Sequence, residues 1–368
     1  MSDRVSIAVV GLGYWGPNLV RAIHDVEDFD VRWVCDLDVD ALQKIGRRYP
    51  AVQRTTDLDE VLADDDVGAV AIATPVSTHF PLAKRALEAG KHVFVEKPLA
   101  ASTAEALALA DFAEARQLVL MPGHTFLYSP PVRTIRALVD SGDIGDIYFV
   151  SSSRVNLGLH QRDVSVAWDL GPHDFSILRY WLQETPTHLA GTCRSCIIPG
   201  TPDVAFINLE FASEAVAQVE LSWLAPSKLR RTTIVGSRKM VVYDDTSNEP
   251  VRVFDSGVML PDPSTFGEYK LSYRTGDIVS PHVSAAEPLV IELSDFCRAI
   301  LTGSTPESSA ELGIEVVKMI EACDVSFARH GSRVRVDGAR VPAPATASEP
   351  QPTQLFPRTG RAPVLPAA

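Results

Sequence analysis

Short apolar runs alternate with amphipathic segments in the first third of the chain. The runs predict strands, with helical patterns between them, near residues 5–10, 31–36, 67–74, 92–97 and 118–122. Strands that alternate with helices are typical of a parallel sheet with helices on both faces. We therefore expect residues 1–124 to form one doubly wound α/β domain.

The pattern changes after residue 124, where strands begin to follow one another over short turns. Helical patterns lie near 130–141, 170–183, 287–301 and 308–328, and strand patterns near 146–156, 187–197, 203–212, 215–224, 231–243 and 250–254. Consecutive strands indicate an antiparallel sheet. Residues 125–340 are expected to form an α+β domain with an open, mostly antiparallel sheet, whose partly apolar face packs on helices or forms a subunit contact.

The last 28 residues show no periodic pattern. Seven prolines fall between Val341 and Ala368. A Pro-rich segment of this kind does not build a packed core. Residues 341–368 are expected to be a disordered tail or an extended arm that lies on a neighbour.

A glycine motif follows the first apolar run. The run ends in Gly11-Leu12-Gly13-Tyr14-Trp15-Gly16, a GxGxxG sequence, and helix-forming residues come next. In such a motif the first glycine permits a tight turn, the second lets the backbone approach a pyrophosphate, and the third lets the helix pack on the strand. The motif predicts a Rossmann-type dinucleotide site; a surface glycine turn is the alternative.

The second predicted strand ends at Asp36, 20 positions after Gly16. A carboxylate there accepts hydrogen bonds from ribose hydroxyls and repels a 2′-phosphate. The expected cofactor is therefore NAD rather than NADP. The alternative is that Asp36 only caps the next helix.

Two further segments carry groups suited to acid–base chemistry. Glu96-Lys97-Pro98 ends a strand at the carboxyl edge of the first sheet, where ligands of open α/β sheets bind. Asp169 and His173 are four residues apart at a helix start and share one face. Each segment alone could be an ordinary charged strand end or helix start. Together with the glycine motif they predict a catalytic group.

Four features occur in this order along the chain: the glycine motif, Thr74-Pro75 with His79, Glu96-Lys97-Pro98, and the spacing of Asp169, Gly171 and His173. In these four features the chain resembles the Gfo/Idh/MocA family of sugar and cyclitol oxidoreductases. The resemblance covers roughly residues 5–335. It implies a Rossmann domain, a second domain with an open sheet, homodimers or homotetramers joined through that sheet, and a cis Lys97-Pro98 bond. It also implies a catalytic group of Lys97, Asp169 and His173, and a cofactor site made of Gly11, Gly13, Tyr14, Trp15, Gly16, Asp36, Thr74, Pro75, His79, Glu96 and Lys97.

The chemistry of the three catalytic candidates agrees with this resemblance. Oxidation of a secondary alcohol requires a base near the hydroxyl oxygen while hydride leaves the carbon. His173 is the expected base, Asp169 orients its ring and stabilises the imidazolium, and Lys97 stabilises the alkoxide. Lys97 is the alternative base if burial favours its neutral form.

The substrate is less sharply defined. Where the family commonly has Asn-Arg-Arg, this chain has His124-Thr125-Phe126, which argues against direct transfer of inositol or glucose specificity. Residues 13–19 and 168–174 look more like members that act on nucleotide-linked sugars, including UDP-N-acetylglucosaminuronate 3-dehydrogenases. Candidate ligands for the substrate, including its carboxylate or diphosphate, are Tyr128, Arg154, Asn156, Trp168, Lys228 and Arg231, with solvated surface residues as the alternative.

Composition and charge argue against several other classes of protein. A formal net charge of -13 disfavours a nucleic-acid partner, because phosphate contacts need a basic face. No apolar run approaches the roughly 20 residues of a membrane helix, and the five scattered cysteines suit a reduced, cytoplasmic protein. Cys193-Arg194-Ser195-Cys196 lacks a second CxxC or HxxxH, so no metal site is expected.

The sequence leaves three functions open. The first is an NAD-dependent oxidoreductase that acts on a sugar ring carbon, at C3 of a nucleotide sugar. In the second, retained NAD assists an elimination or a glycoside hydrolysis. The third is a non-enzymatic NAD-responsive regulator, which the joint presence of Lys97, Asp169 and His173 disfavours.

Overall fold

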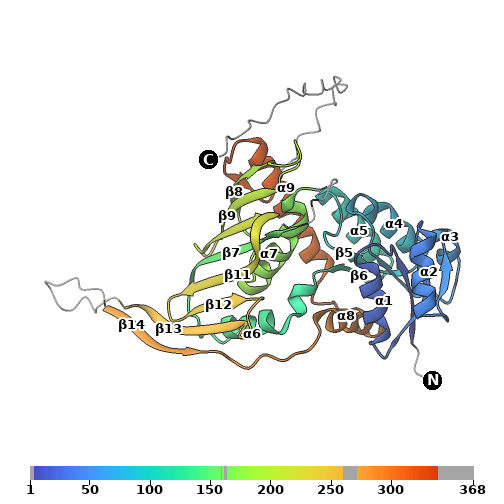
Figure 1. The fold of residues 1–368 in the computed structure, drawn as a ribbon, viewed down its shortest axis with the longest axis horizontal. Helices are drawn as coiled ribbons and strands as arrows, with labels where there is room; N and C mark the ends of the chain where they lie inside the picture. Colours follow the sequence, from blue (N-terminus) through green and yellow to red (C-terminus); the bar gives the residue numbers. More distant parts are fainter. Residues whose placement is uncertain (1–3, 159, 161–163, 260–271, 339–368) are drawn as a thin grey trace, which may run out of the picture.

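The computed structural model of the protein describes residues 4–158, 160, 164–259 and 272–338. Two sheets with their flanking helices lie next to each other, and the chain passes from the first to the second near residue 124 (Figure 1). The predicted tail, residues 341–368, lies outside the described residues.

The first sheet has six parallel strands in the order β3-β2-β1-β4-β5-β6. Their bounds are Val5–Val10 (β1), Phe29–Cys35 (β2), Gln53–Thr55 (β3), Ala69–Ile72 (β4), His92–Glu96 (β5) and Leu120–Gly123 (β6). The predicted doubly wound parallel sheet is confirmed. The sequence pattern misses only β3, because this short edge strand exposes two polar residues instead of forming an apolar run.

Five helices connect these strands: α1 (Gly16–His24), α2 (Val39–Arg48), α3 (Leu58–Leu62), α4 (His79–Glu88) and α5 (Thr103–Ala115). The side chains of Asp57 and Ser102 cap α3 and α5 by accepting hydrogen bonds from backbone N–H groups. Helix α1 has no side-chain cap at Trp15. Pro17 has no N–H and the N–H of Asn18 donates to the carbonyl of Trp15 at 2.9 Å, so the N–H of Gly16 is the one that this first turn leaves for a ligand.

The second sheet has nine strands in the order β14-β13-β12-β11-β7-β10-β9-β8-β15. All neighbours are antiparallel except β7 and β10. The bounds are Ile147–Leu157 (β7), His188–Arg194 (β8), Val204–Glu210 (β9), Val216–Ser222 (β10), Leu224–Gly236 (β11), Met240–Asp244 (β12), Val251–Met259 (β13), Ser272–Val279 (β14) and Val334–Arg335 (β15). The predicted open, mostly antiparallel sheet is confirmed.

One predicted strand of this sheet is wrong. Residues 231–243 form the end of β11, a turn and β12, because Gly236 donates its N–H to the carbonyl of Lys239 (3.1 Å). A Cβ at Gly236 would lie 2.3 Å from the carbonyl oxygen of Ile144, so only glycine fits at this turn. The strands β14 and β15 were not expected, since neither shows a clear apolar alternation.

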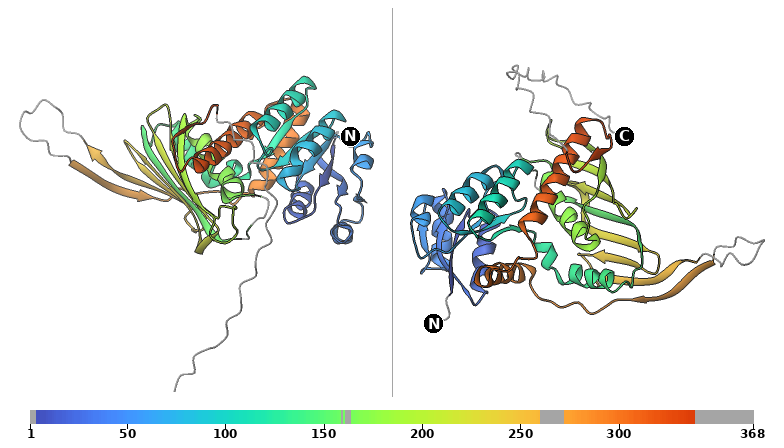
Figure 2. Two further views of the ribbon diagram at one scale, coloured as in Figure 1. Left: turned by 90° about the horizontal axis from the view of Figure 1, so that it is seen from above. Right: turned by 180° about the vertical axis from the view of Figure 1, so that it is seen from behind.

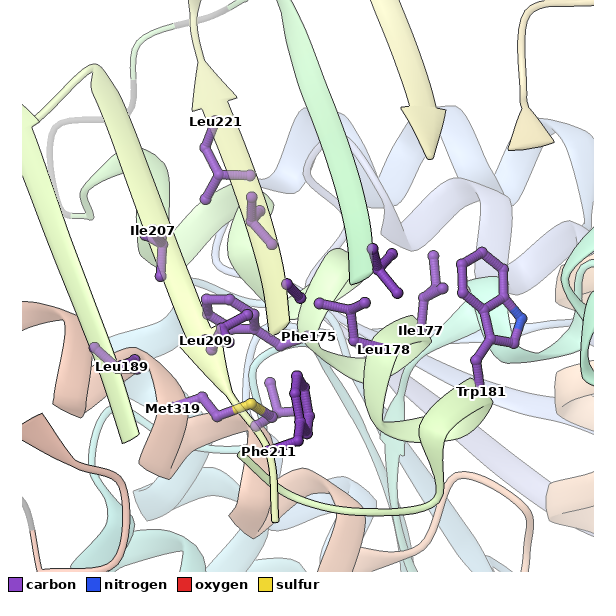
Figure 3. Close-up of a cluster of buried hydrophobic side chains, with 14 of the residues drawn as sticks. Phe175, Ile177, Leu178, Trp181, Leu189, Ile207, Leu209, Phe211, Leu221 and Met319 are labelled. Carbon is purple, nitrogen blue, oxygen red and sulfur yellow. The ribbon is translucent and has the colours of Figure 1, made fainter. Parts of the chain in front are cut away.

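Helices α6 (Pro130–Asp140), α7 (Val166–Leu182) and α9 (Ala310–Ala328) cover one face of the second sheet (Figure 2). Their apolar side chains pack on alternate residues of the strands, and Phe175, Ile207 and Met319 meet in this core (Figure 3). Helix α7 begins four residues earlier than expected because Ser165 caps it by accepting the N–H of Trp168.

Helix α8 (Pro288–Thr302) returns to the first sheet, although it follows the second sheet in the chain. Leu293 and Phe296 are fully buried there, and the rings of Phe296 and Phe94 lie 5.8 Å apart. The nucleotide half is thus completed by a late segment of the chain. None of the described helices is long and apolar enough to cross a bilayer.

Candidate active site

The glycine loop between β1 and α1 combines two tight contacts with one open position. Gly11 has a positive φ of 93°, and a Cβ at Gly16 would lie 2.0 Å from the carbonyl oxygen of Gly11. At Gly13, by contrast, an added Cβ would meet no heavy atom within 4 Å. Gly11 and Gly16 are therefore required by the loop itself, whereas Gly13 leaves free space where a pyrophosphate fits.

Asp36 follows β2 and lies beside this loop. Its carboxylate accepts the backbone N–H of Leu12 and, at 2.7 Å, that of Asp38. Helix α2 is capped by Asp38, so the alternative role of Asp36 as a helix cap is not what the structure shows. The carboxylate is partly exposed and retains lone pairs for the hydroxyls of a ribose.

A cavity of about 1010 Å³ opens between the two sheets. Its walls come from both halves of the chain, with Tyr14, Trp15, Thr74, Glu96 and Lys97 from the first half and Asn156, Asp169, His173, Trp223 and Arg230 from the second. Within the part of the chain that the structure describes, several buried polar atoms around it lack a well-formed hydrogen bond, including Trp15 Nε1, Glu96 Oε1 and His173 Nδ1. Unpaired buried polar atoms are costly, and here they fit a bound cofactor and substrate.

Lys97 is held at the centre of this cavity. It follows β5, its peptide bond to Pro98 is cis, and its Nζ donates to Oδ1 (3.1 Å) and to the backbone carbonyl (2.8 Å) of Asp169. Trp223 Nε1 donates to the other carboxylate oxygen, Oδ2, at 3.1 Å. Asp169 therefore fixes both the ammonium group and an aromatic wall.

This arrangement corrects the role expected for Asp169. Among the described residues, its hydrogen bonds go to Lys97 and Trp223 and none goes to His173. The four-residue spacing does put Asp169 and His173 on one helix, but the ammonium group of Lys97 takes the carboxylate. Asp169 is thus a positioning residue for Lys97.

His173 lies one turn further along α7, and the centroids of its ring and the Phe126 ring are 5.0 Å apart in an edge-to-face arrangement. Burial lowers the pKa of His173 well below its usual value, and the positive charges of Lys97, Arg154 and Arg230 lower this pKa further. The imidazole is therefore neutral at physiological pH and able to accept a proton.

Three other expected cofactor residues, Thr74, Pro75 and His79, lie at different distances from the cavity: one lines it and two do not. Thr74 lines the cavity. Pro75 precedes the short 3-10 helix η1 (Val76–Thr78) and is not among the cavity walls. His79 is buried, and its two ring nitrogens contact the carbonyl oxygens of Pro98 (2.8 Å) and Thr74 (2.9 Å). His79 braces the walls of the cavity instead of lining it.

Of the expected substrate ligands, only Asn156 lines this cavity. Arg154 is buried in an ion pair with Asp174, and the hydroxyl of Tyr128, in the 3-10 helix η2 (Thr125–Tyr128), donates to Asp295 at 2.7 Å. Trp168 faces a separate cavity of about 440 Å³ and donates to Asp324 at 2.7 Å. Each of these three side chains is held by a carboxylate outside this cavity, which the sequence pattern does not reveal.

Lys228 and Arg231 are exposed, and Arg230 takes the place expected for them. Arg230 lies on the same side of β11 as the buried residues Thr232 and Ile234, which the alternation of the strand could have revealed. Its Nη1 donates to Asp245 at 2.9 Å, and its guanidinium lies 5.7 Å from the ring centroid of Phe126. Sequence reasoning also missed Phe126 and Trp223 as cavity walls.

Comparison with protein families agrees with this geometry. Residues 5–124 match the profile of an oxidoreductase family with an NAD-binding Rossmann fold, GFO/IDH/MocA, and residues 132–242 match the profile of the C-terminal domain of the same family. The two matches together span more than half of the chain. The chain belongs to the GFO/IDH/MocA oxidoreductase family. The predicted family and the predicted NAD-binding domain are therefore confirmed.

Relatives of the chain within this family include enzymes of known activity. The scyllo-inositol 2-dehydrogenase (NAD(+)) of Bacillus subtilis is 27% identical over 92% of this chain and 98% of its own length. The crystal structure of GenD2 from gentamicin A biosynthesis in complex with NAD matches with a TM-score of 0.77 and 26% identity, covering 91% of this chain and 97% of GenD2. A dTDP-3,4-didehydro-2,6-dideoxy-alpha-D-glucose 3-reductase of Streptomyces violaceoruber is 45% identical over 26% of this chain and 28% of its own length.

Proposed function

We propose that this family member transfers hydride between NAD and a secondary alcohol or ketone of a sugar, at C3 of a nucleotide-linked sugar. The observation that carries the proposal is the position of Lys97 and His173. Both groups line the cavity that also reaches Tyr14 and Trp15 of the glycine loop. A dinucleotide seated on the loop would have room to extend toward the ammonium group of Lys97 and the neutral imidazole of His173.

Lys97, Asp169 and His173 have different roles in this reaction. Bound NAD supplies the hydride acceptor. His173 accepts the proton of the substrate hydroxyl, because its imidazole is held neutral by burial and by nearby cations. Lys97 stabilises the negative charge that develops on the same oxygen, and Asp169 holds Lys97 in place through two contacts.

Two observations support a sugar as substrate. The Arg230–Asp245 pair and Asn156 present donors and acceptors to one end of the cavity, which suits a ring with several hydroxyl groups. The named relatives reported above act on a cyclitol and on a dTDP-linked sugar. The similarity to the dTDP-sugar 3-reductase, though local, favours C3 and a nucleotide-linked sugar over a free sugar.

A panel of nucleotide sugars, free sugars and cyclitols tests this proposal. Each compound is incubated with the full chain and NAD, and NADH formation is followed by its absorbance. We expect turnover with at least one nucleotide sugar, at a higher kcat/KM than with the free sugar. Product formation without net NADH would favour redox-assisted elimination or hydrolysis instead. NAD-dependent binding to another protein, with no redox activity on any member of the panel, would favour a regulator.

We also propose a homodimer or homotetramer joined through the open face of the second sheet. Phe149 and Val216 are neighbours in register on β7 and β10, and both are about half exposed. Phe206 on β9 is exposed to a similar extent. Light scattering of the purified chain gives its mass in solution, and a monomer that persists at high concentration would contradict this assembly.

A further inference from the structure

The cofactor half of the cavity contains one carboxyl group without a neutralising partner. Glu96 ends β5 and lines the cavity, and no described residue makes a hydrogen bond of ordinary geometry to its buried Oε1. Its other oxygen, Oε2, receives only a long contact of 3.4 Å from the backbone N–H of Lys97. The ammonium group of Lys97 engages Asp169 instead.

Apart from the ammonium group of Lys97, the described groups that surround Glu96 supply no fixed positive charge. From α8, Glu292 is completely buried, its Oε2 accepts the hydroxyl of Thr125 at 2.7 Å, and its Oε1 has no partner. Burial, the largest cause, raises the pKa of Glu292 well above its usual value, and the hydrogen bond from Thr125 offsets part of this rise. Burial therefore favours the protonated, neutral form of Glu292.

The two remaining neighbours are also uncharged. His124, directly after β6, is fully buried, no described residue pairs with either of its ring nitrogens, and burial lowers its pKa to about 3. Trp15, at the start of α1, contributes an uncharged indole N–H, which lies close enough to Glu96 to lower its pKa slightly although the contact falls outside ordinary hydrogen-bond geometry among the described residues. The side-chain ammonium of Lys97, already bound to Asp169, is the one cation among these neighbours of Glu96.

An ionised carboxylate in these surroundings is costly, because buried charges require a partner or additional hydrogen bonds. Burial accordingly raises the pKa of Glu96 to about 7, and the charge of Lys97 offsets only part of this rise. A ligand that brings a positive charge into the cavity would stabilise the carboxylate. The oxidised nicotinamide ring carries such a charge, and the reduced ring does not.

We propose that Glu96 is protonated in the free protein, that its carboxyl oxygen loses this proton to solvent when NAD+ binds, and that it keeps the proton when NADH binds. The charge in the cavity then balances in both complexes. Glu96 would thereby make the affinity for the oxidised cofactor depend on pH and leave the affinity for the reduced cofactor unaffected. The inference rests on NAD binding alone and does not depend on which sugar is the substrate.

Linkage fixes the expected size of the effect. Below pH 7 the affinity for NAD+ should rise by up to about tenfold for each unit by which the pH is raised, because one proton is released on binding. Above pH 7 this affinity should level off. The affinity for NADH should stay nearly constant over the same range. The ratio of the two affinities, rather than either value alone, is the decisive quantity, since both cofactors share the adenosine and pyrophosphate contacts.

Titration calorimetry at pH 6 with the full chain tests the proposal directly. NAD+ and NADH are each titrated in two buffers that differ in ionisation enthalpy, which counts the protons released on binding. We expect about one proton released per NAD+ and none per NADH. Equal proton release for the two cofactors, or none for either, would overturn the proposal without any need for a variant.

Three variants then locate the proton. Glu96→Gln should abolish the release and reduce NAD+ affinity more than NADH affinity. Glu292→Gln keeps an oxygen for the hydroxyl of Thr125 and should retain the release, because Glu292 is neutral already. Asp324→Asn is the matched control: Asp324 is a buried carboxyl whose pKa is raised to about 6 by burial, but it lines the other cavity.

The proton count of each variant decides the assignment. Release that persists in Glu96→Gln would contradict it. So would release that disappears in Glu292→Gln or in Asp324→Asn, because the proton would then come from a different carboxyl group.

Discussion

The two ends of the cavity are specified in different ways. At the nucleotide end, the contacts depend on the backbone of residues 11–16 and on Asp36, which directly follows the neighbouring strand. At the substrate end, Asn156, His173 and Arg230 come from three separate elements of the second sheet and its helix. A local motif therefore identifies the first end, whereas strand register and competition between charged groups determine the second.

The largest expected effect concerns the two groups that connect the ends. Lys97→Ala and His173→Ala should each lower kcat by about 10²–10⁴-fold, the usual contribution of a positioned acid or base. NAD should still bind, because the glycine loop is untouched. Steady-state kinetics and NAD titration by fluorescence measure the two quantities. A kcat near that of the wild type in both variants would show that Lys97 and His173 do not carry out the reaction.

The glycine loop offers a matched pair within the nucleotide end. Gly16→Ala places a Cβ 2.0 Å from the carbonyl oxygen of Gly11 and should destabilise the fold by about 1–3 kcal/mol. Gly13→Ala meets no atom within 4 Å, so its Tm should stay close to that of the wild type while NAD affinity falls about tenfold or more. Thermal unfolding and NAD titration separate the two. If Gly13→Ala bound NAD normally, the open space at Gly13 would have no role in the site.

A second pair of variants, at Arg230 and Arg231, tests the substrate end of the cavity. Arg230 lines the cavity and its neighbour Arg231 is exposed. Arg230→Met should raise KM for the sugar by about tenfold, because hydrogen bonds to a charged group are lost. Arg231→Met should leave KM unchanged. KM values for both variants at saturating NAD test which side of β11 faces the substrate. Equal effects on KM would show that the alternation of side chains along β11 does not decide which arginine contacts the substrate.

The smallest expected effect is a flat pH profile. The pKa of His173 lies well below 6.5, so its imidazole should stay neutral as the pH falls from 7.5 to about 6. At saturating NAD, kcat/KM for oxidation should therefore change little over this range and fall only at lower pH, where the base becomes protonated. An ionisation close to 6.5 in this profile would show that His173 is not the buried base.

These contrasts explain how much the sequence could predict. Both sheets, the glycine loop and Lys97 follow from local patterns, because an apolar run, a tight turn or a strand end is encoded by adjacent residues. The partner of Asp169 and the turn at Gly236 depend on groups distant in the chain, Lys97 and Ile144. No window of the sequence contains both members of either contact.

The candidate substrate ligands show the same limit. The hydroxyl group of Tyr128, an expected substrate ligand, instead donates to Asp295, 167 positions away. Arg231 was chosen for its charge, although alternation along β11 buries the side of Arg230, Thr232 and Ile234. Chemistry alone selects residue types, and packing decides which of them reach the cavity.

The central claim is that hydride passes between NAD and the sugar at Lys97 and His173. The most direct test uses the substrate found in the sugar panel, with deuterium on the carbon that is oxidised, and analyses the cofactor by mass spectrometry and NMR. The wild-type protein should transfer the deuterium to C4 of the nicotinamide, and the Lys97→Ala/His173→Ala double variant should bind NAD and transfer none. Product that forms while the deuterium stays on the sugar carbon would contradict the account.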